Sequence, residues 1–112
     1  MNTVRHILEV KGRDVWTIPP EATVLEALRL MADKDIGALL VVEGERLVGI
    51  LSERDYARKV ILMGKASKDT PVSEIMTSKL YTVHPDQTVE ECMALMTNHR
   101  IRHLPVMDGP EI

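Results

Sequence analysis

The sequence predicts an α+β fold built from two tandem repeats, each with the element order β-α-β-β-α. The first observation is an ungapped internal repeat, in which residues 15–44 recur at 80–109 with a constant offset of 65 residues. The second is a helix-start signature in both copies, and the third is an apolar run typical of a covered strand. One such unit is too small to bury its own sheet, so we expect two units to pack together.

The composition indicates a soluble domain with a modest core. The chain has 112 residues, of which 45% are hydrophobic and 28% charged, with a formal net charge of -3. This balance gives no general attraction to nucleic acid, and no apolar run approaches the roughly 20 residues that span a bilayer. The single cysteine excludes an internal disulfide and is typical of a reducing compartment. We therefore expect a cytoplasmic domain with no nucleic-acid or membrane partner.

Each repeat begins with a short strand and an amphipathic helix. In the first repeat, residues 15–18 are strand-like and two prolines end them. Thr23 and Glu26 have the spacing of a capping box, and Thr88 and Glu91 repeat it in the second copy. The apolar positions that follow have the spacing of one buried helical face. These positions are Val24, Ala27, Leu28 and Met31 in the first repeat, and Val89, Cys92, Met93 and Met96 in the second.

Two strands and a second helix complete the first repeat. Residues 38–42 are apolar without interruption, which is typical of a central strand covered on both faces. Residues 47–51 follow a polar turn and form the predicted hairpin partner. Ser52 then starts a second helix that Gly64 ends. Short helical turns lead into the two repeats at residues 4–8 and 72–77.

The second repeat is predicted to be incomplete. We divide the chain into repeat one with its lead-in, 1–64, a linker and lead-in, 65–79, and repeat two, 80–112. By the constant offset, Ile112 corresponds to Leu47. Repeat two therefore lacks the counterparts of the last strand and the last helix, and we expect the natural protein to continue.

Three local signatures resemble the CBS domain pair, also called the Bateman module, over nearly the whole chain. The first is a proline, a capping threonine and an amphipathic helix, at 20–31 and again at 85–96. The second is Ile-Arg-His-Leu-Pro-Val at 101–106, with a less typical copy at 36–41. The third is Gly-Ile-Leu-Ser-Glu-Arg-Asp at 49–55, which is similar to the family's glycine-hydrophobic-x-Ser/Thr-x-x-Asp motif.

The resemblance implies two units related by a pseudo-twofold axis, with clefts between them that hold adenine nucleotides or related adenosyl compounds. It also implies a homodimer and a regulated partner protein. The function expected from this family is a regulatory sensor of AMP, ADP, ATP or NAD, without a catalytic cofactor. The alternative is a dimerisation or protein-interaction module whose clefts are vestigial.

Carried onto this chain, the family's complete site combines the serine-aspartate motif with residues of repeat two. Asp55 is an acceptor-only carboxylate that can take both ribose hydroxyl protons. Ser52, at a helix start, stands beside backbone amides that attract phosphate, and Arg102 would add charge-assisted hydrogen bonds. The expected ligand-binding residues are Ile50, Ser52, Arg54, Asp55, Leu80, Tyr81, Thr82, Arg102, His103 and Pro105.

A second, weaker cleft is expected from residues of repeat one. Its own serine-aspartate motif is missing from the chain, and Gly37 and Ala38 replace the arginine and histidine of the other copy. Trp16 either covers an adenine there or packs at the start of the first strand. The residues assigned to this cleft are Trp16, Thr17, Gly37 and Ala38.

Several of these residues also have a purely structural interpretation. The Ser52-x-x-Asp55 pattern is itself an N-terminal capping box, and the two roles can coexist. Arg54 can be a solvated charge, while Arg102 and His103 can lie at a sheet edge or a dimer surface. The chain shows no nucleophile-base pair, metal cluster or paired catalytic carboxylates, so we expect neither an enzyme nor a metal site. Cys92 is expected to be a structural thiol.

Overall fold

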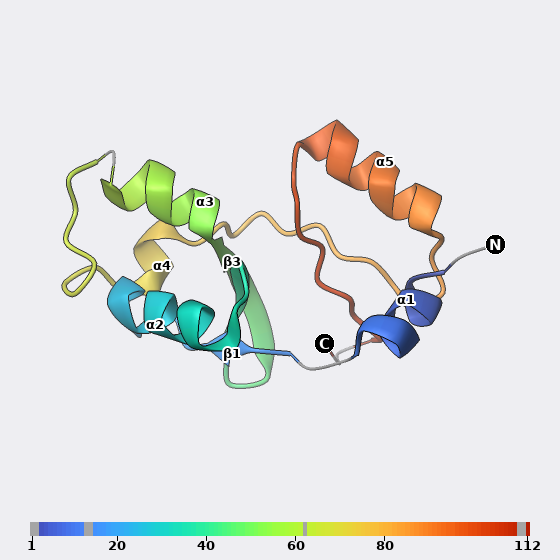
Figure 1. Cartoon of the computed structure of the whole chain (residues 1–112), viewed down its shortest axis with the longest axis horizontal. Helices are drawn as coiled ribbons and strands as arrows, with labels where there is room; N and C mark the ends of the chain where they lie inside the picture. Colours follow the sequence, from blue (N-terminus) through green and yellow to red (C-terminus); the bar gives the residue numbers. More distant parts are fainter. Residues whose placement is uncertain (1–2, 13–14, 62, 110–111) are drawn as a thin grey trace. The chain divides into compact units, whose positions relative to one another are not determined.

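The computed structural model describes residues 3–12, 15–61, 63–109 and 112. The chain divides into two compact units (Figure 1). The repeat-one unit is Trp16–Leu80, and the repeat-two unit combines Met1–Val15 with Tyr81–Ile112. The predicted α+β class is confirmed, and the second repeat is the shorter of the two.

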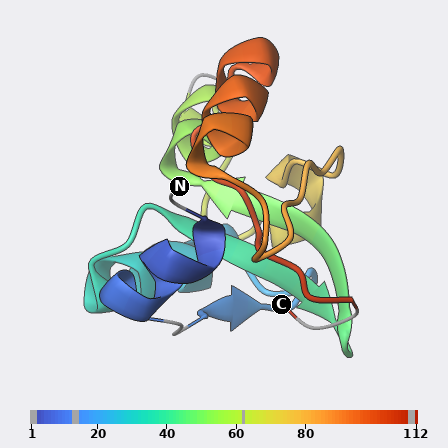
Figure 2. The ribbon, with the colours of Figure 1, turned by 90° about the vertical axis from the view of Figure 1, so that its right-hand side faces the viewer.

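The repeat-one unit contains a three-stranded sheet in the order β1-β2-β3. Strand β1 (Thr17–Ile18) is parallel to β2 (Ala38–Glu43), which is antiparallel to β3 (Arg46–Ser52). Figure 2 shows β2 and β3 as a long twisted hairpin. Its turn contains Gly44 at φ 63°, a left-handed conformation that glycine adopts without the penalty of a Cβ. The predicted strands and their hairpin connection are therefore confirmed.

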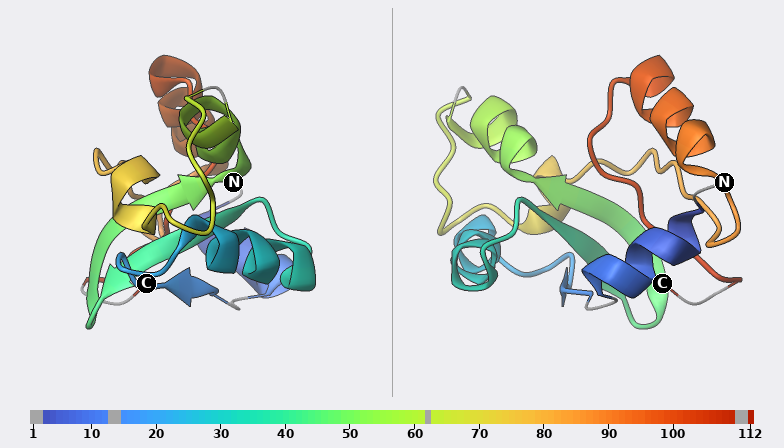
Figure 3. Two further views of the ribbon diagram at one scale, coloured as in Figure 1. Left: turned by 90° about the vertical axis from the view of Figure 1, so that its left-hand side faces the viewer. Right: turned by 45° about the vertical axis from the view of Figure 1, so that its right-hand side comes forward.

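Three helical segments accompany this sheet. Helix α2 (Val24–Lys34) begins at Thr23, whose Oγ1 accepts from the Glu26 amide at 3.2 Å. Only this half of the predicted capping box forms: among the described residues, the Glu26 carboxylate does not accept a hydrogen bond from the Thr23 amide. The remaining segments are α3 (Glu53–Tyr56), which continues as the π-helical turn η1 (Ala57–Ile61), and α4 (Val72–Ile75). Figure 3 shows α3 beginning where β3 ends.

The hydrophobic core of the repeat-one unit joins the sheet to these helices. In β2, Leu39 and Val41 are fully buried, whereas Leu40 and Val42 are only partly buried. The predicted central strand is confirmed, since β2 lies between β1 and β3; one of its faces is buried and the other is partly covered. The core consists of Ile18, Ala22, Val24, Ala27, Met31, Leu39, Val41, Leu51, Val60, Val72 and Ile75.

The repeat-two unit is built around two helices, α1 (Val4–Lys11) and α5 (Val89–His99). The full capping box predicted for α5 is confirmed, since Thr88 Oγ1 accepts from the Glu91 amide and the Glu91 carboxylate accepts from the Thr88 amide, both at 3.1 Å. Helix α1 is fixed by backbone bonds to the turn before α5: the Val4 amide donates to Gln87 O and the Arg5 amide to Pro85 O. The N-terminal lead-in thus packs with repeat two, while α4 packs with repeat one.

The buried face predicted for α5 is wrong for this chain. Met93 is 61% exposed and no residue of α5 is buried, whereas Val24, Ala27 and Met31 of α2 are. The strands predicted at the start of repeat two and at 101–106 are reduced to one parallel bridge between Val83 and Val106. Among the described residues of this unit, no sheet is present to cover the apolar side chains of α5.

Candidate functional site

The serine-aspartate motif lies where β3 meets α3, and it forms a complete capping box. Ser52 Oγ accepts from the Asp55 amide at 3.2 Å. In return, Asp55 Oδ2 accepts from the Ser52 amide at 3.0 Å and from Ser52 Oγ at 3.1 Å. The structural interpretation of this motif is therefore confirmed, and the capping box fixes the orientation of the carboxylate.

The other oxygen of Asp55 also has two partners. Thr77 Oγ1 donates to Asp55 Oδ1 at 3.1 Å, and Lys59 Nζ lies 3.2 Å from the same oxygen. Lys59 also donates to the backbone oxygen of Ile75, at 3.0 Å. Asp55 itself is only 9% exposed. We call Ser52, Asp55, Lys59 and Thr77 the Asp55 cluster.

Thr77 reaches Asp55 because its backbone runs along the edge of β3. The Thr77 amide donates to Ile50 O at 2.8 Å, and the Ile50 amide donates to Thr77 O at 3.0 Å. The neighbouring position, Gly49, makes this close approach possible, because a Cβ there would lie 2.6 Å from Met76 Sδ and 3.1 Å from Thr77 O. The absence of a side chain at Gly49 therefore helps to position Thr77 beside Asp55.

Gly49→Ala is expected to lower the free energy of unfolding by about 2 kcal/mol, the usual scale of overpacking. The Met76 side chain can move away from the new methyl group, but the Thr77 backbone can move only by weakening its bonds to β3. Gly37→Ala is the matched control, because a Cβ at Gly37 would make only an ordinary contact, 3.6 Å from Glu53 Oε1. Denaturant unfolding of both variants checks this, and equal stability of the two would contradict the steric argument.

The other residues predicted for the complete site fall into both compact units. Ile50 and Leu80 are partly buried and Arg54 is exposed in the repeat-one unit. In the repeat-two unit, the Tyr81 ring stacks on His99 with centroids 3.8 Å apart, and Pro105 is buried. The remaining predicted residues of that unit, Thr82, Arg102 and His103, are exposed. The structure thus brings Ser52, Asp55 and Ile50 together around β3, and it groups the residues from 81 onward in the other unit.

All four residues of the predicted second cleft belong to the repeat-one unit. Trp16 is 39% exposed, and its ring lies under Lys34 Nζ, which is 4.4 Å from the ring centroid. Its backbone oxygen accepts from the Leu40 amide, which extends the pairing of the first strand. These contacts favour the interpretation of Trp16 as a packing residue at the strand start. Thr17 begins β1, Ala38 begins β2, and Gly37 O accepts from the Glu53 amide.

Two members of the Asp55 cluster were not predicted from the sequence. Lys59 lies four residues after Asp55, a spacing that places two side chains on the same side of a helix and favours ion pairs. The sequence spacing of Asp55 and Lys59 could therefore have predicted this ion pair. Thr77 lies 22 residues away in the chain, and no local pattern indicates its contact with Asp55.

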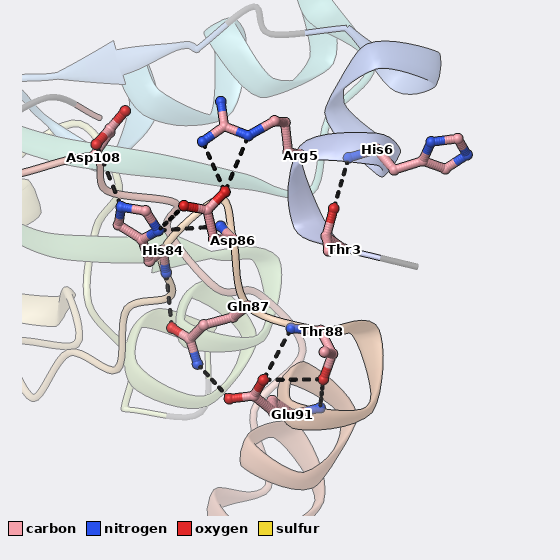
Figure 4. Close-up of polar contacts among 9 residues, drawn as sticks. All are labelled: Thr3, Arg5, His6, His84, Asp86, Gln87, Thr88, Glu91 and Asp108. Atoms are coloured by element: carbon pink, nitrogen blue, oxygen red, sulfur yellow. Dashed lines mark hydrogen bonds and ion pairs between the residues drawn. The ribbon is translucent and has the colours of Figure 1, made fainter. Parts of the chain in front are cut away.

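A second polar group, in the repeat-two unit, joins α1 to the chain around α5 (Figure 4). Arg5 forms an ion pair with Asp86 at 2.9 Å, and His84 lies between Asp86 and Asp108 at 3.5 and 3.4 Å. Hydrogen bonds from Thr88 lower the pKa of Glu91, whereas burial and the neighbouring Glu91 charge raise the pKa of Cys92. Within the described part of the chain, no group of three or more His, Cys, Asp or Glu side chains could hold a metal ion.

A family model described as the CBS domain matches residues 4–62 and 72–111. The chain belongs to the CBS domain family. As a CBS pair it is a regulatory module by family. It is 42% identical over 115 residues to the CBS domain-containing protein CBSX3, mitochondrial, of Arabidopsis thaliana, covering 94% of this chain. The chain spans 55% of the length of that relative.

Solved structures give the same assignment. The crystal structure of the CBS domain NE2398 matches this CBS pair with a TM-score of 0.95 at 50% identity, covering 99% of this chain and 87% of the other. The CBS domain pair of protein MJ0100, in complex with 5-methylthioadenosine and S-adenosyl-L-methionine, matches with a TM-score of 0.87 at 27% identity. That match covers 99% of this chain and 84% of the CBS domain pair in that structure. Of the helices described here, none is both long and apolar enough to cross a membrane.

Proposed function

We propose that this CBS pair is a regulatory module that binds an adenosyl compound, such as AMP, ADP, ATP or NAD, between its two repeats. The observation that carries the proposal is the Asp55 carboxylate, which the capping box holds in one orientation within the family motif. The adenosyl ligands of the MJ0100 pair support the ligand class, because that protein shares the fold and 27% of the sequence.

In this proposal each predicted residue meets one part of the ligand. Asp55 accepts hydrogen bonds from the ribose hydroxyls, and Ser52 lies beside the phosphate. Arginine and histidine side chains supply charge-assisted bonds to the phosphate oxygens. The phosphate would meet Arg54, Arg102 and His103, and the adenine would lie against Ile50, Leu80 and Tyr81. Thr82 and Pro105 complete the proposed set of ligand-binding residues.

Binding would act by shifting a conformational equilibrium. A ligand that contacts groups from both compact units favours the arrangement in which it makes all of these contacts. A partner protein or a fused domain then responds to that arrangement. We propose that the module is a cytoplasmic homodimer, that it has no catalytic activity or catalytic cofactor, and that neither nucleic acid nor a membrane is among its partners.

A thermal unfolding series with AMP, ADP, ATP, NAD, NADH, S-adenosylmethionine and 5-methylthioadenosine tests the proposal. A ligand present at 100 times its Kd is expected to add about 2.7 kcal/mol of stability, which shifts the unfolding midpoint visibly. Asp55→Asn should abolish the shift, because it replaces one acceptor oxygen with a donor. Glu91→Gln, which alters the exposed capping box of α5, should keep it. If no compound moves the midpoint, the proposal is wrong.

A second candidate is a dimerisation or protein-interaction module with vestigial clefts. The exposed apolar side of α5, where Met93 is 61% exposed, favours it. An oligomer in sedimentation experiments that no adenosyl compound alters would support this function over ligand sensing.

A further inference from the structure

The Asp55 carboxylate has no hydrogen-bonding capacity to spare. A carboxylate offers about four acceptor positions on its two oxygens. Oδ2 accepts from the amide and the hydroxyl of Ser52, and Oδ1 is occupied by Thr77 Oγ1 and Lys59 Nζ. Each ribose hydroxyl that binds Asp55 must therefore replace one of these donors, and the first replaces the donor that is easiest to displace.

The four donors differ in how easily they can leave. The two bonds from Ser52 hold the first turn of α3, so losing them would disrupt the start of that helix. Lys59 balances the charge of the carboxylate and is fixed at its other side by Ile75 O. The Thr77 hydroxyl can rotate away about χ1 while the backbone of Thr77 keeps both bonds to Ile50. Thr77 is therefore the donor that is easiest to displace.

We propose that Thr77 is a positioning residue that occupies the ribose-binding oxygen of Asp55 and is displaced when an adenosyl ligand binds. This inference rests on the proposed function and adds a residue that lowers the affinity of the site.

The test compares ligand affinity in three threonine variants by calorimetric titration with the compounds named above. Thr77→Val removes the hydroxyl and keeps the shape, so it should lower Kd about tenfold, the scale of one hydrogen bond to a charged group. Thr77→Ser keeps the hydroxyl and should bind like the wild type. Thr70→Val is the matched control, because buried Thr70 loses a bond to Ala66 O that lies outside the Asp55 cluster.

The outcomes separate this inference from the proposed function. Tighter binding by Thr77→Val, together with lower thermal stability, supports the displacement, because a purely structural role would not raise affinity. Unchanged or weaker binding by Thr77→Val, with normal binding by the wild type, overturns the displacement and leaves the proposed function intact. If neither the wild type nor any variant binds a compound, both are wrong. Thr77→Ala replaces Thr77→Val if the valine variant does not fold, with the same expected result.

Discussion

Asp55→Ala is expected to lower the free energy of unfolding by about 3 kcal/mol and to abolish binding of any adenosyl ligand. The substitution removes the acceptor of three hydrogen bonds, two from Ser52 and one from Thr77. The N-cap bond from the residue-55 amide to Ser52 Oγ remains, whereas each lost hydrogen bond to the charged carboxylate contributes about 1.5–3 kcal/mol in favourable cases. The ion pair adds little, because Lys59 is 44% exposed and solvent screens it.

Denaturant unfolding and ligand titration of the same preparations measure the two effects separately. Asp55→Asn is the informative companion, because it keeps the side-chain volume and one carbonyl oxygen. It should recover part of the stability while still failing to bind ligand. An alanine variant that retained full affinity would show that Asp55 has only the structural role of a cap.

Met31→Ala is expected to cost about 3 kcal/mol of folding stability, whereas its repeat-two counterpart Met96→Ala should cost clearly less. Met31 is 3% exposed inside the core of the repeat-one unit, and truncating a buried methionine leaves a cavity. Met96 lies one 65-residue offset later, on a helix that has no buried residue. The same substitution at equivalent positions therefore removes different amounts of packing.

Chemical denaturation of the two methionine variants, fitted with a common slope, gives the comparison directly. Leu28→Ala and Met93→Ala form a second matched pair on the same helices. Leu28 packs against the core, and Met93 is 61% exposed. Equal losses within each pair would mean that α5 is as well packed as α2 in solution, contrary to this structure.

The elements that the sequence predicted correctly are those with local causes. Thr23 and Thr88 mark helix starts because a threonine oxygen satisfies an amide three residues later. The β2–β3 hairpin follows from two apolar runs separated by a turn with Gly44. The internal repeat and the motif at 49–55 were sufficient to indicate the family, which the comparisons confirm.

The features that the sequence did not predict depend on contacts between distant segments. The apolar spacing of α5 equals that of a buried helix, but burial also needs a neighbouring surface. Among the described residues, the two strands predicted for repeat two are reduced to the Val83–Val106 bridge. Thr77 joins the Asp55 cluster only because Gly49 lets its backbone approach β3. The grouping of the ligand residues by resemblance stays a prediction, since it concerns both compact units.

The packing of the two lead-in helices, α1 and α4, decides which fragments of the chain keep a complete core. The sequence repeat divides the chain near residue 65, but the compact units have other boundaries. Helix α4 follows residue 65 and belongs to the repeat-one unit, whereas α1 lies near the start of the chain and belongs to the repeat-two unit. A fragment that ends where the first repeat ends would leave behind Val72 and Ile75, two fully buried core residues. Deleting the first fifteen residues would, in the same way, remove α1 from the repeat-two unit and so destabilise the second half of the protein.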